Sequence, residues 1–458
     1  MNTKSRLTRL LALAALSAAP LLADMPATPF QPDGKPDPGY MVPDELSLSY
    51  ALSFALDNNF AIRQAKERIR QQEGIVLEVR SAQIPNVAAS ASYSRLDREI
   101  SSTGENRNWG LSISARQVLF AAGGVRASVK AQQYALDAAV LQLQSVIDVA
   151  LLDVRTKFYN VLVSRERIKV QEQNVELLGR QLQDVRNRYE AGTVSNFEVL
   201  RAEVAVANAQ VPLITARNSH RLAIEELRQA LGFTTADGTN VGRIPTFVGT
   251  LEFSPVNVEL ASALASAKER RPDLQRLRRL EQAAEQVVTV RKSDLYPDLA
   301  LAGSYSWNKA PFTNSFSDAR DGWTLGLQST WNIFDGNATR GRVAQARSSL
   351  EQTKLALEEA ELAVQVEVRR AISSLQEATE LAEASKKVVE QAEEAVRLAD
   401  ARYSAGTATQ LDVLQARTDL TTARLNQLQA FYSFNVASAN LRRAMGLPDE
   451  QAGANAAR

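Results

Sequence analysis

The chain has 458 residues, with 53 Lys and Arg against 52 Asp and Glu, for a formal net charge of +1. This balance gives no indication of a surface that binds nucleic acid. The sequence has no cysteine, which excludes disulfides, thiolate metal sites and lipid attachment to a cysteine.

The N-terminus has the layout of a secretory signal peptide. Residues 1–23 combine a basic start with an apolar stretch from Leu10 to Leu22 and a small residue at Ala23. The alternatives are a short buried helix or a membrane anchor, but the apolar stretch is too short to span a membrane comfortably. We expect no other stretch that is apolar and long enough for a transmembrane helix, so a mature chain inserted in a membrane must use a β-barrel.

One stretch of sequence occurs twice. Residues 188–202, RYEAGTVSNFEVLRA, recur as residues 402–416, RYSAGTATQLDVLQA, so that Tyr189 of the first copy corresponds to Tyr403 of the second. Each copy ends one long helical pattern and begins another, because its glycine favours the conformation that stops a helix. Ser195 or Thr409 is then the candidate N-cap of the next helix. The stretch predicts the tip of a helical hairpin, and its recurrence predicts one duplicated body.

The other predicted segments follow this duplication. The prolines between residues 24 and 45 disfavour a helix and predict an extended arm. The chain then divides into a first repeat, a linker that we expect to form a belt at mid-height, a second repeat and a flexible tail: residues 46–233, 234–255, 256–447 and 448–458. Each repeat contains a strand hairpin followed by a long helical hairpin.

The predicted strands alternate apolar with small or polar residues, over residues 87–94 and 109–115, and again over 299–307 and 323–331. A strand of about 11 residues, tilted by about 40°, covers roughly the 25 Å apolar height of an outer-membrane barrel. We expect all the tryptophans to lie in these strands as a membrane girdle: Trp109, Trp307, Trp323 and Trp331. The alternative is the edge of a soluble sheet, which four isolated strands would not stabilise without a core.

The predicted helices differ greatly in length. Residues 126–188 and 338–402 predict two long helices, and about 65 helical residues extend about 98 Å with coiled-coil spacing. The returning helices, residues 196–231 and 411–445, are about half as long. We expect the first to stack end to end on a helix over residues 256–294. We expect the second to stack on a helix that runs from about Leu46 to Ala82.

The strands of one chain are too few to close a barrel, and open strand edges are not tolerated in lipid. We therefore expect an oligomer, and about 8, 12 or 16 strands from two, three or four copies are all permitted. The same oligomer would close a hollow helical cylinder beneath the barrel.

Three further motifs accompany the tips: RPDL at residues 271–274, YPDL at 296–299 and IFDG at 333–336. Together, over about residues 46–447, these features resemble the TolC family of outer-membrane efflux proteins. The resemblance implies a mainly α fold with β, internally duplicated, whose four transmembrane β-strands per chain complete a 12-stranded barrel in a homotrimer. The rest would be a long periplasmic α-helical coiled-coil barrel, closed at its tips until a periplasmic adaptor (membrane fusion) protein and an inner-membrane transporter engage it.

The tip residues divide by role. Glu198 and Asp412 are equivalent positions; if both face the axis they form an acidic pore constriction, and otherwise they are favourable acids in a first helical turn. The exposed turns predict an adaptor-docking surface that also ends the helices: Gly192, Thr193, Gly406 and Thr407. Tip packing or a latch is expected from four more residues: Arg188, Tyr189, Arg402 and Tyr403. Ala408 and Gln415 depart from the charges that relatives often carry there.

The sequence gives little support for an enzyme. The sequence has no Gly-rich phosphate loop, nucleophile elbow or metal-ligand cluster, so we expect no catalysis, cofactor or metal. The single histidine, His220, and the basic stretch at residues 268–279 are expected on solvated helix faces. Two other classes of protein stay open: a structural coiled-coil protein of the cell envelope without channel activity, and a periplasmic adaptor. An adaptor would need one helical hairpin flanked by β-domains, whereas this chain predicts two.

Overall fold

The computed structural model describes residues 45–95, 97, 99, 107–233, 245–311 and 318–449. The predicted signal peptide, the proline-rich arm up to residue 44 and the tail from residue 450 lie outside these ranges. All the elements named below belong to one compact unit.

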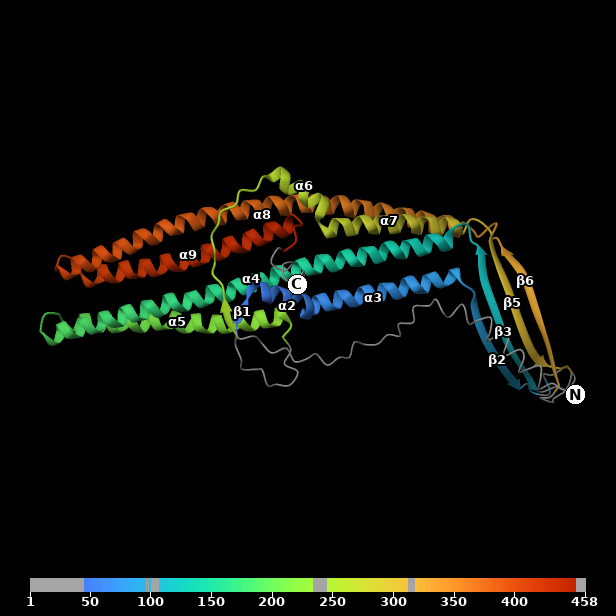
Figure 1. Cartoon of the computed structure of the whole chain (residues 1–458), viewed down its shortest axis with the longest axis horizontal. Coiled ribbons are helices and arrows are strands. Elements are labelled where there is room, and N and C mark those ends of the chain that lie inside the picture. Colours follow the sequence, from blue (N-terminus) through green and yellow to red (C-terminus); the bar gives the residue numbers. More distant parts are fainter. Residues whose placement is uncertain are drawn as a thin grey trace. The chain divides into compact units, whose positions relative to one another are not determined.

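The described elements repeat in the same order (Figure 1). The first repeat contains β1 (Glu45–Ser47), α2 (Leu48–Asn58), α3 (Phe60–Arg80), the 3-10 turn η1 (Ser81–Gln83), β2 (Asn86–Arg95), β3 (Arg107–Phe120), α4 (Gly124–Glu190) and α5 (Asn196–Leu231). After β4 (Thr246–Val248), the second contains α6 (Leu260–Arg270), α7 (Pro272–Ser293), β5 (Asp298–Lys309), β6 (Ala319–Thr330), α8 (Ala338–Ser404) and α9 (Gln410–Ala444). The helices α4 and α8 each have 67 residues and start at equivalent positions of the two repeats, which confirms the duplication.

Two of the predicted helices are broken in the middle. The helix expected from Leu46 divides at Asn59, whose Oδ1 accepts hydrogen bonds from the backbone of Ala61 and Ile62 at 2.9 and 3.3 Å and so caps α3. The helix expected over residues 256–294 divides at Arg271, because Pro272 cannot donate a backbone hydrogen bond and starts the new helix α7.

The predicted stacking of the shorter helices is wrong, because the pairs are exchanged. Gly232, at the end of α5, lies against the backbone of Asn58 between α2 and α3, and a Cβ there would come within 2.4 Å of the Asn58 carbonyl oxygen. Gly446, at the end of α9, lies in the same way against the backbone of Arg271 between α6 and α7. Helix α5 is therefore followed along α4 by α3, and α9 is followed by α7 (Figure 1).

The linker after α5 explains this exchange, because it carries the chain from one helical hairpin to the other. Its Phe247 packs edge-on against Phe158 of α4, with ring centroids 6.2 Å apart. Farther along, Phe253 packs against Phe431 and Phe434 of α9, at 5.8 and 4.8 Å. The helix that follows the linker therefore starts beside α8 and α9, not above α5.

The long strands form an antiparallel sheet in the order β2-β3-β5-β6. Its register places apolar residues on one face, where Leu111 lies opposite Trp307 and Leu301 opposite Leu327. Hydroxyl side chains pair on the other face, as in the 2.8 Å contact between Ser304 and Thr324. The alternation predicted for both hairpins is confirmed, and within the described residues β2 and β6 each leave one edge unpaired.

The tryptophans lie near both ends of this sheet. Trp109, Trp307 and Trp323 are in β3, β5 and β6 near the loops that join the hairpin strands. Trp331 lies one residue beyond β6, and its Nε1 donates to the Leu295 carbonyl at 3.1 Å. The prediction that all four tryptophans lie in strands is thus wrong for Trp331, because the chain leaves the sheet after Thr330 to enter α8.

The principal core lies where α2, α4, α5 and the linker meet. It contains large buried side chains from all four segments, including Leu52, Phe158, Leu227 and Phe247. Helix α4 also holds an 18-residue window with a mean hydropathy of 1.6, of which 17% is buried, so the expectation of no later apolar stretch long enough for a membrane is wrong. Length and composition alone are weak evidence for a span, and α4 packs against α3, α5, α7 and α9 along its length.

Candidate gate and docking tips

The two hairpin tips share one backbone structure. We call α4–α5 hairpin 1 and α8–α9 hairpin 2. Gly192 and Gly406 both adopt a φ of 73°, a left-handed conformation that ends each long helix. Thr193 then donates from both its N–H and its Oγ1 to the Arg188 carbonyl at 2.9 Å, and Thr407 does the same to Arg402 at 2.9 and 3.1 Å. These glycines and threonines are exposed, so each tip presents a small, rigid turn.

At the second tip, Asp412 caps the start of α9. The backbone N–H and Oγ1 of Thr409 both donate to Asp412 Oδ2 at 2.8 Å, and the N–H of Asp412 donates back to Thr409 Oγ1 at 3.3 Å. These hydrogen bonds, with the charge of Arg402, hold the pKa of the Asp412 carboxyl below its ordinary value. Within one chain, Asp412 is therefore a favourable acid in the first turn of α9, which is the alternative to a pore-facing role.

At the first tip, Glu198 has a different environment. Ser195 makes no side-chain cap, and the nearest cation to Glu198 is Arg201, at 3.9 Å. The Glu198 Oε2 atom is buried and has no hydrogen-bond partner. The two equivalent carboxylates therefore differ: Asp412 accepts hydrogen bonds from its own helix cap, whereas one oxygen of Glu198 accepts none.

One contact joins the two hairpins at the tips. The guanidinium of Arg188, at the end of α4, lies 4.8 Å from the ring centroid of Tyr403, near the end of α8. This is a cation–π contact between hairpins 1 and 2. Four residues were expected to pack or latch the tips, and within one chain the structure brings two of them together, Arg188 and Tyr403. Tyr189 is 47% exposed.

Above the tips, arginines cross the contact between α4 and α9, which we call the seam. Arg417 donates to Gln181 Oε1 of α4 at 2.8 Å and to Asp400 of α8 at 3.0 Å. One heptad farther along α9, Arg424 donates to Gln173 of α4 at 3.2 Å and to Glu393 of α8 at 2.9 Å. Sequence reasoning missed both arginines, although their spacing of seven on one helix face was visible.

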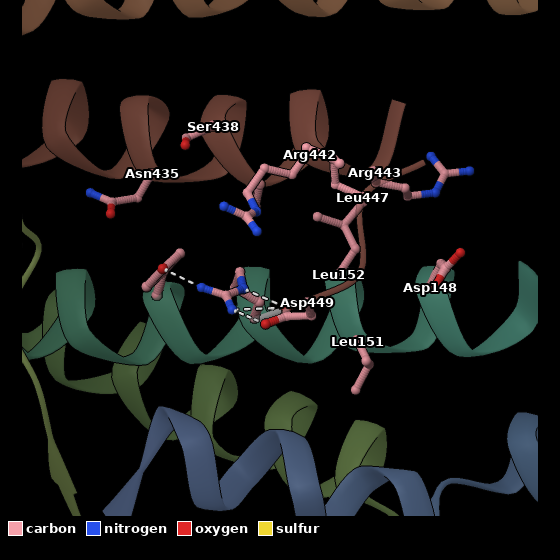
Figure 2. Close-up of a pocket in the computed structure, with 12 residues that line it drawn as sticks. Asp148, Leu151, Leu152, Asn435, Ser438, Arg442, Arg443, Leu447 and Asp449 are labelled. Atoms are coloured by element: carbon pink, nitrogen blue, oxygen red, sulfur yellow. Dashed lines mark hydrogen bonds and ion pairs between the residues drawn. The ribbon is translucent and has the colours of Figure 1, made fainter. Parts of the chain in front are cut away.

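At mid-height, the seam contains a cavity of about 100 Å³ beside the C-terminal segment (Figure 2). Arg155 of α4 makes a bidentate ion pair with Asp449, with donor–acceptor distances of 2.6 and 2.8 Å from Nη2. Arg155 also donates to the Tyr159 hydroxyl at 3.1 Å. Burial raises the pKa of the nearby Asp148 carboxyl, to which Gln144 donates a hydrogen bond.

Two of the residues expected on solvated faces are enclosed. His220 is half-buried and its Nδ1 lies 2.9 Å from the Oγ of the buried Ser164; burial, together with the charge of Arg165, lowers its pKa. Arg271 is only 6% exposed because the break between α6 and α7 packs against α8; it pairs with Asp273 of α7 and with Glu367 of α8. Within the described ranges, no group of three or more His, Cys, Asp or Glu side chains is placed to hold a metal.

A duplicated chain whose repeats each join a two-faced strand hairpin to a long helical hairpin has the fold of an outer-membrane channel subunit. Residues 51–233 and 263–447 match the family described as Outer membrane efflux protein, and the chain belongs to that family. It is an outer-membrane channel protein of efflux or secretion, as the residues predicted. The alternatives of a structural coiled-coil protein and of a periplasmic adaptor are set aside.

Relatives and solved structures agree with this assignment. Protein CyaE of Bordetella pertussis is 28% identical over 384 residues, which is 83% of this chain and 80% of CyaE. Outer membrane protein TolC of Escherichia coli is 25% identical over 387 residues, covering 82% of this chain and 77% of TolC. The fold is similar to that of the Campylobacter jejuni CmeC outer membrane channel, with a TM-score of 0.76 at 15% identity over 90% of this chain and 88% of that one.

Proposed function

We propose that three copies of the chain form one channel, in which their strands close a 12-stranded barrel and their helices a tunnel beneath it. The observation that carries this proposal is that sheet and helices end in matching free edges. In the described part of the chain, β2 and β6 are the edge strands of the sheet. Pairing β2 of one copy with β6 of the next would leave no open edge in lipid.

The helices have corresponding free edges. On the tip side, α5 packs on α4, α4 on α9 and α9 on α8, so α5 and α8 are the outermost helices. Helix α5 exposes apolar side chains at a three-four and heptad spacing: Phe197, Leu200, Val204, Val211 and Ile214. Helix α8 exposes its own: Leu381, Val388 and Leu398. A coiled-coil contact between α5 of one copy and α8 of the next would bury both stripes.

The duplication supports the same ring at the tips. Within one chain, Arg188 of hairpin 1 stacks on Tyr403 of hairpin 2. In the duplicated sequence, Arg188 corresponds to Arg402 and Tyr403 corresponds to Tyr189, so the equivalent pair is Arg402 with Tyr189. In a ring of alternating hairpins, Arg402 would therefore stack on Tyr189 of the neighbouring copy, which gives a role to both remaining residues of the predicted latch.

The tryptophans support membrane insertion of the sheet in outer-membrane lipid. Trp323 and Trp331 are eight residues apart, about 27 Å along an extended chain, which at a tilt of about 40° covers about 21 Å of the roughly 25 Å apolar height of an outer-membrane barrel. Trp109 and Trp307 lie near Trp323 at the loop end of the sheet. We assign the four indoles to the two interfaces of the membrane, where aromatic side chains are enriched.

Replacing Leu325 and Leu327 together with Asp should abolish membrane insertion. Both side chains are 66% exposed on the apolar face, where an Arg or Lys at mid-membrane would cost about 2–4 kcal/mol and each Asp a smaller but still unfavourable amount. Thr324→Asp with Gln328→Asp places the same charges on the opposite face and should insert normally. The measurement is the fraction of protein in outer-membrane fractions; equal insertion of the two double variants would contradict the barrel.

The helical part would extend through the periplasm towards partners in the inner membrane. We assign the turns at Gly192, Thr193, Gly406 and Thr407 as the docking surface of a periplasmic adaptor, because small exposed residues allow another helix to approach closely. The adaptor would connect the channel to an inner-membrane transporter that supplies the energy. The chain itself would then do no enzymatic chemistry, an inference supported by the transport function of its family.

An acidic constriction at the tips is supported by Glu198, whose Oε2 atom has no hydrogen-bond partner within the chain. Glu198 and Asp412 from three copies would place six carboxylates around the axis, where they attract cations. Glu198→Ala combined with Asp412→Ala should raise single-channel conductance and weaken block by cations in planar bilayers. Glu198→Gln with Asp412→Asn removes the charges but keeps the volume, so it should reproduce the loss of block. Unchanged conductance and block in both double variants would remove these residues from the constriction.

A further inference from the structure

A groove of about 500 Å³ opens where the sheet meets the helices, at the point where β3 leads into α4 (Figure 1). Its walls include Gln83 of η1, Val118 and Phe120 of β3, and Arg126 of α4. Gln117 Nε2 donates to the carbonyls of Gln83 and Val118 at 3.3 and 2.9 Å, which ties two of these walls together. The groove is therefore built into the fold, and its volume is within the range of about 300–1,000 Å³ of small-ligand sites.

One wall of the groove continues the apolar face of the sheet. Phe120 lies opposite Leu299 on that face, and Leu119 and Phe120 are 53% and 54% exposed. Leu299 lies in turn opposite Ser329, two residues before Trp331 at the helix end of the sheet. Because the helices extend into the periplasm, this is the level of the inner leaflet of the outer membrane.

The helix ends around the groove carry positive charge that the chain does not pair. Among the described residues, five exposed cations there make no ion pair: Arg80 of α3, Arg126 and Lys130 of α4, and Arg291 and Lys292 of α7. The end of α7 lies against the start of α4, because a Cβ on Gly124 would come within 2.2 Å of Ser293 Oγ. Glu78, in the last turn of α3, is the unpaired acid at this level of the described chain. The charge around the groove is therefore mainly positive.

The second repeat shows what the equivalent helix start binds. Asp335 Oδ2 accepts hydrogen bonds from the N–H and Oγ1 of Thr339 in the first turn of α8, at 2.7 and 2.6 Å. The same turn precedes α4, with a φ of 83° at Gly123 against 71° at the equivalent Asn337. The residue equivalent to Asp335 is Ala121, and in the described chain no side chain caps α4 and no acid lies in its first turn. The start of α4 therefore attracts an anion that the chain itself does not supply.

These features together fit a phospholipid with an anionic headgroup. A helix N-terminus and an arginine in its first turn both favour phosphate. A free phosphate would leave Leu119 and Phe120 exposed, and an uncharged apolar ligand would leave the cations unpaired. The chain has no cysteine for a covalent lipid anchor, so non-covalent contacts would have to hold such a lipid.

We propose that the groove binds an anionic phospholipid of the inner leaflet, with its phosphate at Arg126 and the start of α4 and its acyl chains along Leu119 and Phe120. The placement of the groove at the membrane surface rests on the proposed insertion of the sheet. The binding itself can be measured without a channel, in detergent.

The test compares equivalent arginines of the two repeats in the full-length protein. Native mass spectrometry of the protein in an uncharged detergent counts the bound lipids as phosphatidylglycerol is added, with phosphatidylcholine of the same acyl chains as the reference. The unmodified protein should prefer phosphatidylglycerol. Arg126→Gln should weaken that binding about fivefold, the usual contribution of one cation at an anionic membrane surface. Arg340→Gln should leave it unchanged, because Asp335 already occupies the start of α8.

A second variant separates lipid binding from damage to the fold. Ala121→Asp gives the first repeat the carboxylate that Asp335 supplies to the second. The new carboxylate should cap α4 and repel the phosphate, so phosphatidylglycerol binding should fall while the unfolding temperature stays the same or rises. A variant that only disturbed the fold would lower both.

Several outcomes would overturn the groove as a lipid site. They are equal retention of the two lipids by the unmodified protein, equal losses in Arg126→Gln and Arg340→Gln, and displacement of the lipid by equimolar inorganic phosphate. Arg126→Gln might instead reduce the mass of the oligomer at an unchanged number of lipids per chain, which would show that a second copy covers the groove. Channels that form without a preference for phosphatidylglycerol would overturn the groove alone, whereas lipid binding by a protein that forms no channels would contradict the proposed function alone.

Discussion

Gly232→Ala should be among the most destabilising single substitutions in the chain, and Gly446→Ala should act in the same way in the second repeat. Gly232 has a φ of 76°, and an L side chain in that conformation costs about 1–2 kcal/mol. The added Cβ would also lie 2.4 Å from the Asn58 carbonyl oxygen, an atom of the backbone that cannot rotate away. With the usual cost of overpacking, the expected loss is about 2–5 kcal/mol.

The measurement is unfolding of the purified protein in detergent, followed by circular dichroism. Gly179→Ala is a matched control, because Gly179 is inside α4 and a Cβ there would have nothing within 4 Å. That substitution should stabilise the helix by up to about 1 kcal/mol. Equal unfolding midpoints for Gly232→Ala and Gly179→Ala would show that the α5 end does not lie against the α2–α3 break.

Arg271→Gln should destabilise the second repeat by about 1.5–3 kcal/mol, because it removes the charge-assisted hydrogen bonds that the buried guanidinium donates to two partly exposed carboxylates. Arg271 pairs with Asp273 at 2.7 Å and with Glu367, which also accepts from Arg443 at 3.3 Å. Arg278→Gln is the control: Arg278 is 40% exposed, its pair with Glu361 spans 3.3 Å, and its loss should cost at most about 1 kcal/mol. Similar unfolding midpoints for the two variants would show that Arg271 does not stabilise the contact between the α6–α7 break and α8.

The same pair predicts how stability depends on pH. Burial alone would raise the pKa of Asp273, but the hydrogen bonds and charge of Arg271 outweigh it and hold that pKa below the ordinary 3.8. A carboxyl whose folded pKa is depressed stabilises the fold above its unfolded pKa, and this stabilisation is lost as the pH falls through the folded value. Asp273 should therefore contribute to acid unfolding of the unmodified chain below about pH 4. In Arg271→Gln the carboxyl loses this pairing, so its contribution to acid unfolding should disappear, which an acid titration by circular dichroism measures.

The sequence by itself determined the duplication, the strand hairpins and the tips. Each depends on residues that are close together in the chain. The alternation around Leu325 makes a two-faced strand, and Gly192 or Gly406 ends a helix wherever that helix lies. The duplication then produces these local structures a second time, so α4 and α8 have equal lengths.

The tertiary structure alone decided which helix ends meet and which charged residues are enclosed. Local propensity predicts where a helix ends but not what that end contacts. It therefore did not indicate that Gly232, at the end of α5, lies against Asn58 and not against the helix that follows the linker. Arg271 was expected on a solvated face and Arg417 was not singled out, because their partners Glu367 and Gln181 are far away in sequence. Burial and pairing of a charge depend on what the fold brings beside it, and for these residues that was fixed by the crossing of the linker and the packing of α4 against α9.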